Sequence, residues 1–502
     1  MIACFFFVIL RPMIGIINNI AFNAFKLGDK RLNNRLSVLY KQLGGSIGTS
    51  TPVAIHDRNQ TKAYYRFINN AKVLFENLTA GYGTYSIEQT KAYDVILAIQ
   101  DTTTLNYSSK KAAPNLDCLE SDTDKGFMLH NHLLVNGLGC PVGLFSQRFF
   151  ARKAGEMGSN KSNRRKKMPF EEKESYRWLE EFNALQEAYK DDTDKLVVQV
   201  CDREADIHEV LQARKYDHVH YIIRSSYERV DDDKTKSSIW QQVADQAFAY
   251  EYDLEIPEGR KRSARTATMQ VRYTCVTINA GYRKGGGLHP SKVWVLETKE
   301  VSNVPEGEEP ICWRLLTSIE ILSPKIAALV IQYYVFRWLI ERFHYVLKQG
   351  LCAEDLQIKE KMALQNAIVL KSWQALDVMT LAYMPKVAPE MRLLEAGFSM
   401  EEYTLAYVYA KTMCNSKEKQ QSDPMLVDFV RLIAQIGGHS LQAKKPIGVV
   451  SIWRGWTTFC LIKDIAKLLN NTACKIDVDV GVKAKMPKIK SVKRTLSNVG
   501  NQ

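Results

Sequence analysis

The sequence predicts a multidomain α/β protein in which a core of strands and helices is flanked by helical regions. Two short and nearly continuous apolar runs, at Val95–Ile99 and Leu196–Val200, are typical of buried strands. Apolar residues recur at helical spacing before the first run and again after residue 325. The length of 502 residues is too great for one compact core, so two to four domains are expected.

The composition is that of an ordinary globular protein with an excess of positive charge. Lys and Arg outnumber Asp and Glu by 68 to 55, which gives a formal net charge of +13. This excess favours a polyanionic partner such as nucleic acid, although a merely basic globular protein is equally compatible with the charge alone. The ten cysteines form no Cys-x-x-Cys pair, so neither a zinc site nor a disulfide framework is indicated, and a cytoplasmic location fits best.

The first ten residues are strongly apolar and are followed by Arg11-Pro12. This run is too short to span a bilayer, and it lacks the basic start and the small-residue cleavage site of a signal peptide. We interpret it as a packed or disordered leader, or as an over-long start upstream of Met13. No other apolar run approaches membrane length, so no membrane partner is expected.

Residues 14–88 are predicted to form helices with basic faces. Asp29 is placed to cap a helix that carries Arg31 and Arg35, and Arg66 lies on a later helix. Such faces suit the DNA backbone, where Lys and Arg neutralise phosphates. We therefore predict DNA contacts from these three arginines, with solvated helix faces as the alternative.

The rest of the chain alternates between strand and helix patterns before it becomes helical. Strands are expected at 128–135, 142–150 and through most of 218–319, a charged loop at 155–167, a helix at 174–189, further helices from 325 to about 469, and a free basic end at 483–494.

Asp101 and Asp202 each follow one of the two buried apolar runs. An Asp just beyond a buried strand projects from the carboxyl edge of the sheet, where α/β proteins bind their ligands. Asp202 is also placed to cap a helix that begins at Arg203, which is the alternative explanation. Two aspartates in the same setting are less easily explained by capping.

A third acidic residue, Glu341, lies on a predicted helix with an unusual polar stripe. On an ideal helix, Tyr334, Arg337, Glu341 and Lys348 fall within a stripe about 60° wide and about 21 Å long. Trp338 borders this stripe. An ordinary solvated surface is the alternative, but it does not require charges aligned over two heptads.

Three acidic side chains that converge repel one another unless cations neutralise them. Oxygen ligands without Cys or His favour Mg²⁺, with Mn²⁺ as a substitute. We therefore predict that Asp101, Asp202 and Glu341 are catalytic and bind two ions, which clamp the attacking and leaving oxygens of a phosphoryl transfer. The two basic residues of the stripe would grip the flanking phosphates, and Tyr334 would hydrogen-bond or pack against one.

These residues resemble the bacterial DDE transposases of insertion-sequence family four, most closely the Tn-five type. Tyr334-x2-Arg337-x3-Glu341-x6-Lys348 matches the Tyr-Arg-Glu-Lys signature at the spacing of that family. Asp101-Thr102-Thr103 resembles the first motif of the family, and the Val-Cys-Asp-Arg-Glu-Ala-Asp-Ile segment at 200–207 resembles its second motif. The likeness extends from about residue 24 to 348, and beyond residue 363 only a helical character is similar.

The resemblance implies a particular domain organisation. It places an RNase H-like catalytic core at 89–349 with a β-rich insertion at about 226–307. Flanking it are an all-α DNA-binding domain for transposon ends at 14–88 and an all-α dimerisation domain at 362–480. A basic tail follows at 481–502.

The resemblance also implies cut-and-paste transposition of an insertion sequence. Magnesium-dependent nicking at the transposon ends is followed by hairpin formation, hairpin opening and strand transfer into target DNA. The expected partners are double-stranded DNA, as terminal inverted repeats and target, and a second copy of the chain in the synaptic complex. The expected location is the cytoplasm, in association with the nucleoid.

Hairpin formation requires a base that is flipped out of the stack and held on an aromatic face. Trp313 resembles the stacking tryptophan of the family, Trp338 the neighbouring probe, and Arg224 an arginine that contacts phosphate. For Trp313 the alternative is a core residue of an apolar strand. His130 and His344 also match positions in the family, and for each the alternative is a packed or hydrogen-bonded histidine.

Two other functions compete with an active transposase. A catalytically inactive DNA-binding protein that inhibits transposition would keep the dimer contacts but lose cleavage or end recognition. A nuclease that only hydrolyses DNA would need no pocket at Trp313.

Overall fold

The computed structural model describes most of the chain between residues 22 and 472. The described residues are 22, 25–44, 50–55, 57–152, 168–231, 237–256, 258–259, 262–280, 287–302, 304–440 and 446–472. The predicted apolar leader, the predicted charged loop at 155–167 and the basic tail at 481–502 lie outside them. None of the described helices combines the length and the apolarity that a bilayer crossing requires.

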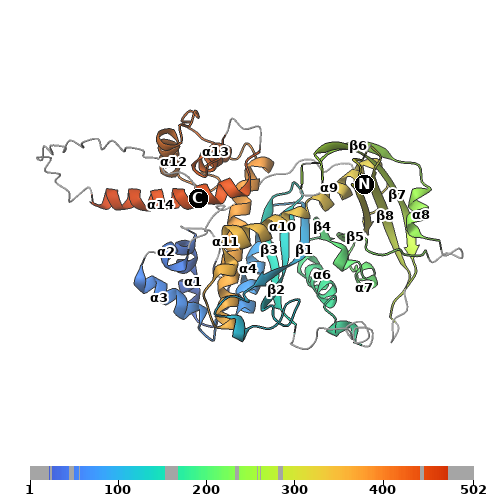
Figure 1. The fold of residues 1–502 in the computed structure, drawn as a ribbon, viewed down its shortest axis with the longest axis horizontal. Coiled ribbons are helices and arrows are strands. Elements are labelled where there is room, and N and C mark those ends of the chain that lie inside the picture. The colour runs from blue at the N-terminus through green and yellow to red at the C-terminus, as the bar shows by residue number, and fades with distance from the viewer. Residues whose placement is uncertain are drawn as a thin grey trace, which may run out of the picture.

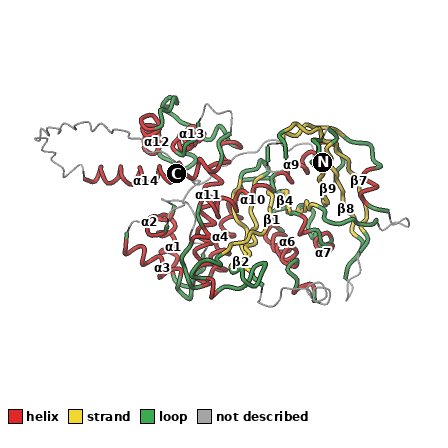
Figure 2. The backbone as a smooth tube through the Cα atoms, in the orientation of Figure 1, coloured by secondary structure: helices red, strands yellow, loops and turns green. Residues whose placement is uncertain are grey.

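Nine strands form one mixed sheet at the centre of the molecule (Figures 1 and 2). Their order across the sheet is β3-β2-β1-β4-β5-β9-β8-β7-β6. Strands β1, β4 and β5 are parallel, and all other neighbouring pairs are antiparallel. The strands are β1 (Val95–Asn106), β2 (Gly126–Asn136), β3 (Pro141–Phe150), β4 (Leu196–Cys201), β5 (Val219–Arg224), β6 (Tyr250–Ile256), β7 (Arg265–Ile278), β8 (Ser291–Glu300) and β9 (Cys312–Thr317).

The apolar runs of β1 and β4 are nearly continuous because both faces of the sheet are covered. Leu97 and Ile99 point into a core shared with helix α11 (Lys361–Val387), whereas Ile96 and Ala98 point into a second core with helix α6 (Tyr176–Tyr189). Successive side chains of a strand alternate between faces, so a run buried on both sides is almost entirely apolar. The polar exception, Gln199 of β4, is buried and accepts a hydrogen bond from Gln100 at 2.8 Å. The predictions of buried strands in these two runs are confirmed.

The N-terminal helices are α1 (Lys30–Leu43), α2 (Thr51–Ile55), α3 (Arg58–Ile68) and α4 (Phe75–Thr90). Asp29 caps α1 as predicted, because its side chain accepts a hydrogen bond from the Arg31 amide. The apolar faces of these helices join the core that α11 shares with the sheet, and Figure 1 shows α4 and α11 side by side. The predicted domain boundaries stay predictions.

The region predicted to be rich in strands continues the central sheet. Strands β6 to β8 extend it beyond β9, and the short helix α8 (Ile239–Ala244), which the sequence did not predict, packs against β7 and β8. The remaining helices are α7 (His208–Leu211), α9 (Pro324–Val335), α10 (Trp338–Tyr345), α12 (Met400–Met413), α13 (Leu426–Ile436) and α14 (Val449–Thr472).

The helix that carries the predicted polar stripe is not continuous. Helix α9 ends at Val335, α10 begins at Trp338, and a π-helical turn occupies Val346–Gly350. The prediction of one straight helix from Tyr334 to Lys348 was wrong, because a turn at residues 336–337 and the wider π turn each rotate the following residues. The angular positions calculated for an ideal helix therefore hold only within α10.

Candidate active site

Asp101 lies within strand β1 and not beyond its end, which corrects the prediction from sequence. Strand β1 runs on to Asn106 because it pairs with β2 along its whole length, with Asp101 opposite Asn131. Its pairing with β4, in contrast, stops at Ile99 opposite Val200. Asp101 therefore stands where β1 passes the carboxyl end of β4, and its side chain is mostly buried at 18% exposed.

Asp202 stands directly after β4, at the position predicted for it. Its side chain accepts a hydrogen bond of 2.9 Å from the Glu204 amide and caps a short 3₁₀ turn at Arg203–Ala205. The capping alternative is thus correct for one of its two oxygens. Asp101 and Asp202 each lie two residues beyond Ile99 and Val200, the last residues paired between β1 and β4, and are therefore neighbours at the sheet.

Electrostatic repulsion identifies the three acidic residues as neighbours. Burial raises the pKa of Asp101 to about 7, and the negative charges of Asp202 and Glu341 contribute to the increase. The Thr102 amide and the Arg337 guanidinium act in the opposite direction. A carboxylate whose pKa is raised by other carboxylates has too little positive charge around it.

Glu341 is engaged by an arginine of its own segment. The Arg337 guanidinium donates to Glu341 Oε1 at 2.6 Å. Within the part of the chain that the structure describes, no three His, Cys, Asp or Glu side chains are close enough to hold one metal ion between them. The ion pair gives a physical reason, since it keeps one Glu341 oxygen on the guanidinium. The site therefore consists of two adjacent aspartates with a third carboxylate close by and paired.

The residues of the site fit a hard divalent cation in their chemistry. All three candidate ligands are carboxylates, and a bound cation would favour the charged form of Asp101, whose pKa is raised by burial and by the two neighbouring carboxylates. Glu341 would have to exchange part of its contact with Arg337 for the cation. Asp101 and Asp202 need no such exchange, because neither forms an ion pair with Lys or Arg at the site.

An aromatic and cationic cluster lies beside the carboxylates. Trp313, on β9, packs edge-on against Tyr334 with ring centroids 5.7 Å apart, and Arg337 lies over the same Tyr334 ring at 5.9 Å. Burial raises the pKa of the Tyr334 hydroxyl, whereas Arg337 and Arg224 beside it act in the opposite direction. The structure thus brings together four residues that the sequence predicted to contact DNA, and Trp313 is half-buried rather than a core residue.

Two further predicted DNA contacts differ in their accessibility. Trp338 is 54% exposed at the start of α10, as a residue that probes DNA would be. The Lys348 ammonium donates to the Thr104 carbonyl at 2.8 Å and lies 3.5 Å from Glu354. Lys348 is therefore occupied by β1 and its own segment, so a phosphate would have to replace these contacts.

The three N-terminal arginines lie apart from the carboxylates, on α1 and α3. Arg31 and Arg66 are exposed, and Arg31 forms an ion pair with Asp29. Arg35 is half-buried and donates to Gln60 at 2.8 Å, which joins the two helices. Exposed cations on a helical unit suit a phosphate backbone.

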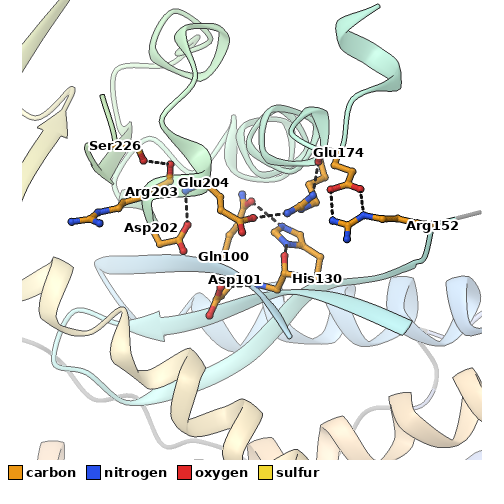
Figure 3. A network of polar contacts seen from close by, with 11 residues as sticks. Gln100, Asp101, His130, Arg152, Glu174, Asp202, Arg203, Glu204 and Ser226 are labelled. Atoms are coloured by element: carbon orange, nitrogen blue, oxygen red, sulfur yellow. Dashed lines mark hydrogen bonds and ion pairs between the residues drawn. The ribbon is translucent and has the colours of Figure 1, made fainter. Parts of the chain in front are cut away.

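A polar network lies beside the turn that follows Asp202 (Figure 3). The Arg177 guanidinium donates to the Glu204 carboxylate at 2.7 Å and to the Glu174 carbonyl at 2.6 Å, and Arg152 grips the Glu174 carboxylate with two nitrogens. The network thereby anchors the turn that Asp202 caps. No role had been predicted for Arg152, Glu174 or Arg177.

His130 and His344 are both buried, which agrees with the packed alternative, but their surroundings differ. His130 contacts the Thr102 hydroxyl at 2.9 Å and the Gln100 amide oxygen at 3.1 Å. His344 contacts the Asn131 amide at 2.9 Å and places Nδ1 3.8 Å from Asp101 Oδ2. Burial lowers the pKa of both rings, that of His344 to about 3, so both are neutral.

Comparison with known proteins gives one match to a family. Residues 19–73 match the family model described as transposase DNA-binding. This segment contains α1 to α3 and all three N-terminal arginines. The match identifies a DNA-binding unit of the transposase kind at this end of the chain.

One solved structure is similar over most of the chain but only weakly. It is the cryo-electron microscopy structure of the piggyBac transposase synaptic complex with hairpin DNA, with a TM-score of 0.33 and 9% sequence identity. The alignment covers 91% of this chain and 73% of that chain. A TM-score of this size is too low to establish a common fold.

Proposed function

We propose that the chain is a DNA transposase that cuts transposon ends and joins them to target DNA in a magnesium-dependent reaction. One observation carries the proposal: a segment that matches a transposase DNA-binding unit is joined to a sheet beside which three carboxylates, Asp101, Asp202 and Glu341, lie close enough to raise the pKa of Asp101. The strand order 3-2-1-4-5, with the second strand antiparallel, supports an RNase H-like core. The resemblance to insertion-sequence family four remains a prediction.

The three carboxylates would hold the divalent ions. When bound, such ions activate a water molecule or a 3′ hydroxyl and stabilise the departing oxygen of the phosphodiester. The protein contributes a rigid placement for two of the ligands, because Asp101 lies within a strand and Asp202 is fixed by its cap. To bind an ion, Glu341 of α10 would have to leave Arg337, and the freed guanidinium would then be available to a phosphate.

The aromatic cluster would bind the strand that is cut. Trp313 is half-buried with Arg224 and Arg337 near it, so a flipped base could stack there while its phosphates meet the cations. Trp338 is exposed on the adjacent helix and would fill the gap that the base leaves. Hairpin formation and pairing of two ends in a homodimer belong to the same proposal.

The test is cleavage of a duplex that carries the inverted repeat flanking the coding region, in Mg²⁺ and in Mn²⁺. We expect Asp101→Asn, Asp202→Asn and Glu341→Gln each to reduce nicking by about 10³-fold or more, equivalent to about 4 kcal/mol of lost transition-state stabilisation. Binding of the duplex in gel shifts should persist. Asp217→Asn, a change of a fully exposed carboxylate, is the matched control and should cut normally.

One observation favours a second function, an inactive DNA-binding inhibitor of transposition. Glu341 is paired with Arg337, and no three ligands are in place within the described residues. Wild-type protein that binds the repeat but cuts it in neither cation would support the inhibitor and reject the enzyme. Cleavage that the three substitutions leave intact would reject the assignment of the carboxylates.

A further inference from the structure

A buried chain of three side chains leads from strand β3 to Asp101. The Gln147 amide donates to Asn131 Oδ1 at 2.8 Å, and Asn131 Nδ2 contacts His344 Nε2 at 2.9 Å. His344 Nδ1 then faces Asp101 Oδ2 at 3.8 Å. All three side chains are buried, with Asn131 completely inaccessible. Buried polar groups of this kind are costly unless they are satisfied, so their arrangement is specific.

The direction of the hydrogen bonds follows from the surroundings of Asn131. Its Oδ1 accepts from Gln147, and its Nδ2 lies 3.5 Å from the Leu129 carbonyl, where a second oxygen would be repelled. The Asn131 nitrogen is therefore the donor to His344 Nε2. A neutral imidazole that accepts at Nε2 carries its proton on Nδ1. The proton of His344 thus points towards Asp101.

The two oxygens of Asp101 consequently have different partners. Oδ1 accepts from the Thr102 amide at 2.8 Å, and Oδ2 faces the N–H of His344 at a distance longer than a hydrogen bond. A neutral N–H donor orients a carboxylate but leaves its full negative charge available to a cation. Groups in this outer position orient the ligands of metal sites.

We infer that His344 is a positioning residue for Asp101, and that Asn131 and Gln147 fix the tautomer in which it faces that carboxylate. The inference rests on the proposed function in so far as Asp101 is a ligand. The tautomer itself follows from the contacts alone. The inference gives a role to one of the two histidines that the resemblance singled out. His130 differs, because its described polar contacts are with Thr102 and Gln100 and not with an acidic residue of the site.

The first experiment reads the tautomer by ¹⁵N NMR of the full chain labelled only at its nine histidines. His344→Gln identifies the signal. We expect the wild-type ring to be neutral with its proton on Nδ1. In Asn131→Asp the new carboxylate can only accept, so Nε2 should become protonated, either by a change of tautomer or because the ring between two carboxylates takes up a second proton. A wild-type proton on Nε2, or an Nε2 that stays unprotonated in Asn131→Asp, would overturn the inference.

The second experiment measures the effect on cation binding. We expect His344→Gln and Asn131→Asp each to weaken Mn²⁺ binding, followed by electron paramagnetic resonance, by about 10-fold, and to raise the Mg²⁺ concentration for half-maximal nicking equally. His132→Asn is the matched control. His132 is a buried histidine next to Asn131 in β2, and it contacts Glu181 instead of Asp101. Its replacement should lower the free energy of unfolding but should leave the affinity for Mn²⁺ unchanged.

The outcomes separate this inference from the proposed function. If wild-type protein binds no Mn²⁺ and cuts no DNA, the proposed function fails. The NMR experiment then still tests whether Asn131 donates to His344 and directs the proton of the ring towards Asp101. If wild-type protein binds Mn²⁺ and both variants bind it equally well, His344 does not position Asp101. Equal weakening in the His132→Asn control would attribute the loss to general destabilisation and would likewise reject the positioning role.

Discussion

Two buried aspartates in different regions of the molecule both titrate far above the usual range, for different reasons. At the candidate active site, burial raises the pKa of Asp101 to about 7 with help from neighbouring carboxylates. At the junction of α1 and α11, burial raises the pKa of Asp377 to about 8, opposed only by a hydrogen bond from Tyr40. Other carboxylates act on the first aspartate, whereas burial alone raises the pKa of the second.

The difference separates a site for ligands from a structural contact. Asp377 lies among aromatic rings, with Tyr82 stacked on Trp373 and Tyr40 packed edge-on against that same tryptophan. A single phenol satisfies it, and no second carboxylate is recorded as acting on it. A perturbed pKa alone therefore does not indicate function, but a pKa perturbed by other acidic groups does.

The largest expected contrast is in the response to divalent cations. Mn²⁺ at one hundred times its Kd should raise the free energy of unfolding of the wild type by about 2.7 kcal/mol. Asp101→Asn should lose this stabilisation, whereas Asp377→Asn should retain it, as measured by urea unfolding with and without Mn²⁺. Equal responses of the two variants would remove the distinction between the regions.

The second contrast is in the pH dependence of stability. The folded pKa of Asp377 is raised above its unfolded value near 3.8, so its stabilising contribution is complete below pH 4 and is lost as the pH rises through about 8. Between pH 5 and pH 8, wild type should therefore lose about 1.4 kcal/mol or more relative to Asp377→Asn. Parallel curves for the two proteins in urea unfolding would contradict the assignment.

The smallest expected effect is at the candidate site itself. The Arg337–Glu341 pair joins residues four apart on a partly exposed segment, and such pairs contribute about 0.5 kcal/mol. A double-mutant cycle with Arg337→Ala and Glu341→Ala, followed by urea unfolding without divalent cations, should give a coupling energy of this size. A coupling above about 1.5 kcal/mol would mean that the pair serves stability and is not readily exchanged for a cation.

The sequence predicted the elements of the site better than their exact geometry. Nearly continuous apolar runs located β1 and β4, because strands covered on both faces have few polar positions. The full length of β1 was not predictable, since residues 101–106 are held by pairing with β2 rather than by their own apolar pattern. The break before Trp338 also had no local signal, because the turn at residues 336–337 contains neither Gly nor Pro.

The supporting contacts of the site could not be predicted at all. Asn131 and Gln147 lie in strands that carry several other polar residues, and His344, which Asn131 contacts, is 213 residues away along the chain. A single sequence does not indicate which buried amide faces which ring. His344 was singled out only through the resemblance, and the structure supplies the physical reason for its place.

Helix α11 also holds the N-terminal helices against the body of the protein that carries the candidate active site. Its Asn366 side chain donates to the carbonyls of Ile68 and Val73, and its Gln374 side chain donates to the carbonyl of Leu43. The segment that matches a DNA-binding unit is thereby attached to the body of the protein by hydrogen bonds to its backbone carbonyls, in addition to its chain connection. If α1 to α3 bind DNA as proposed, α11 therefore holds the DNA-binding surface at a fixed position relative to the sheet that carries Asp101.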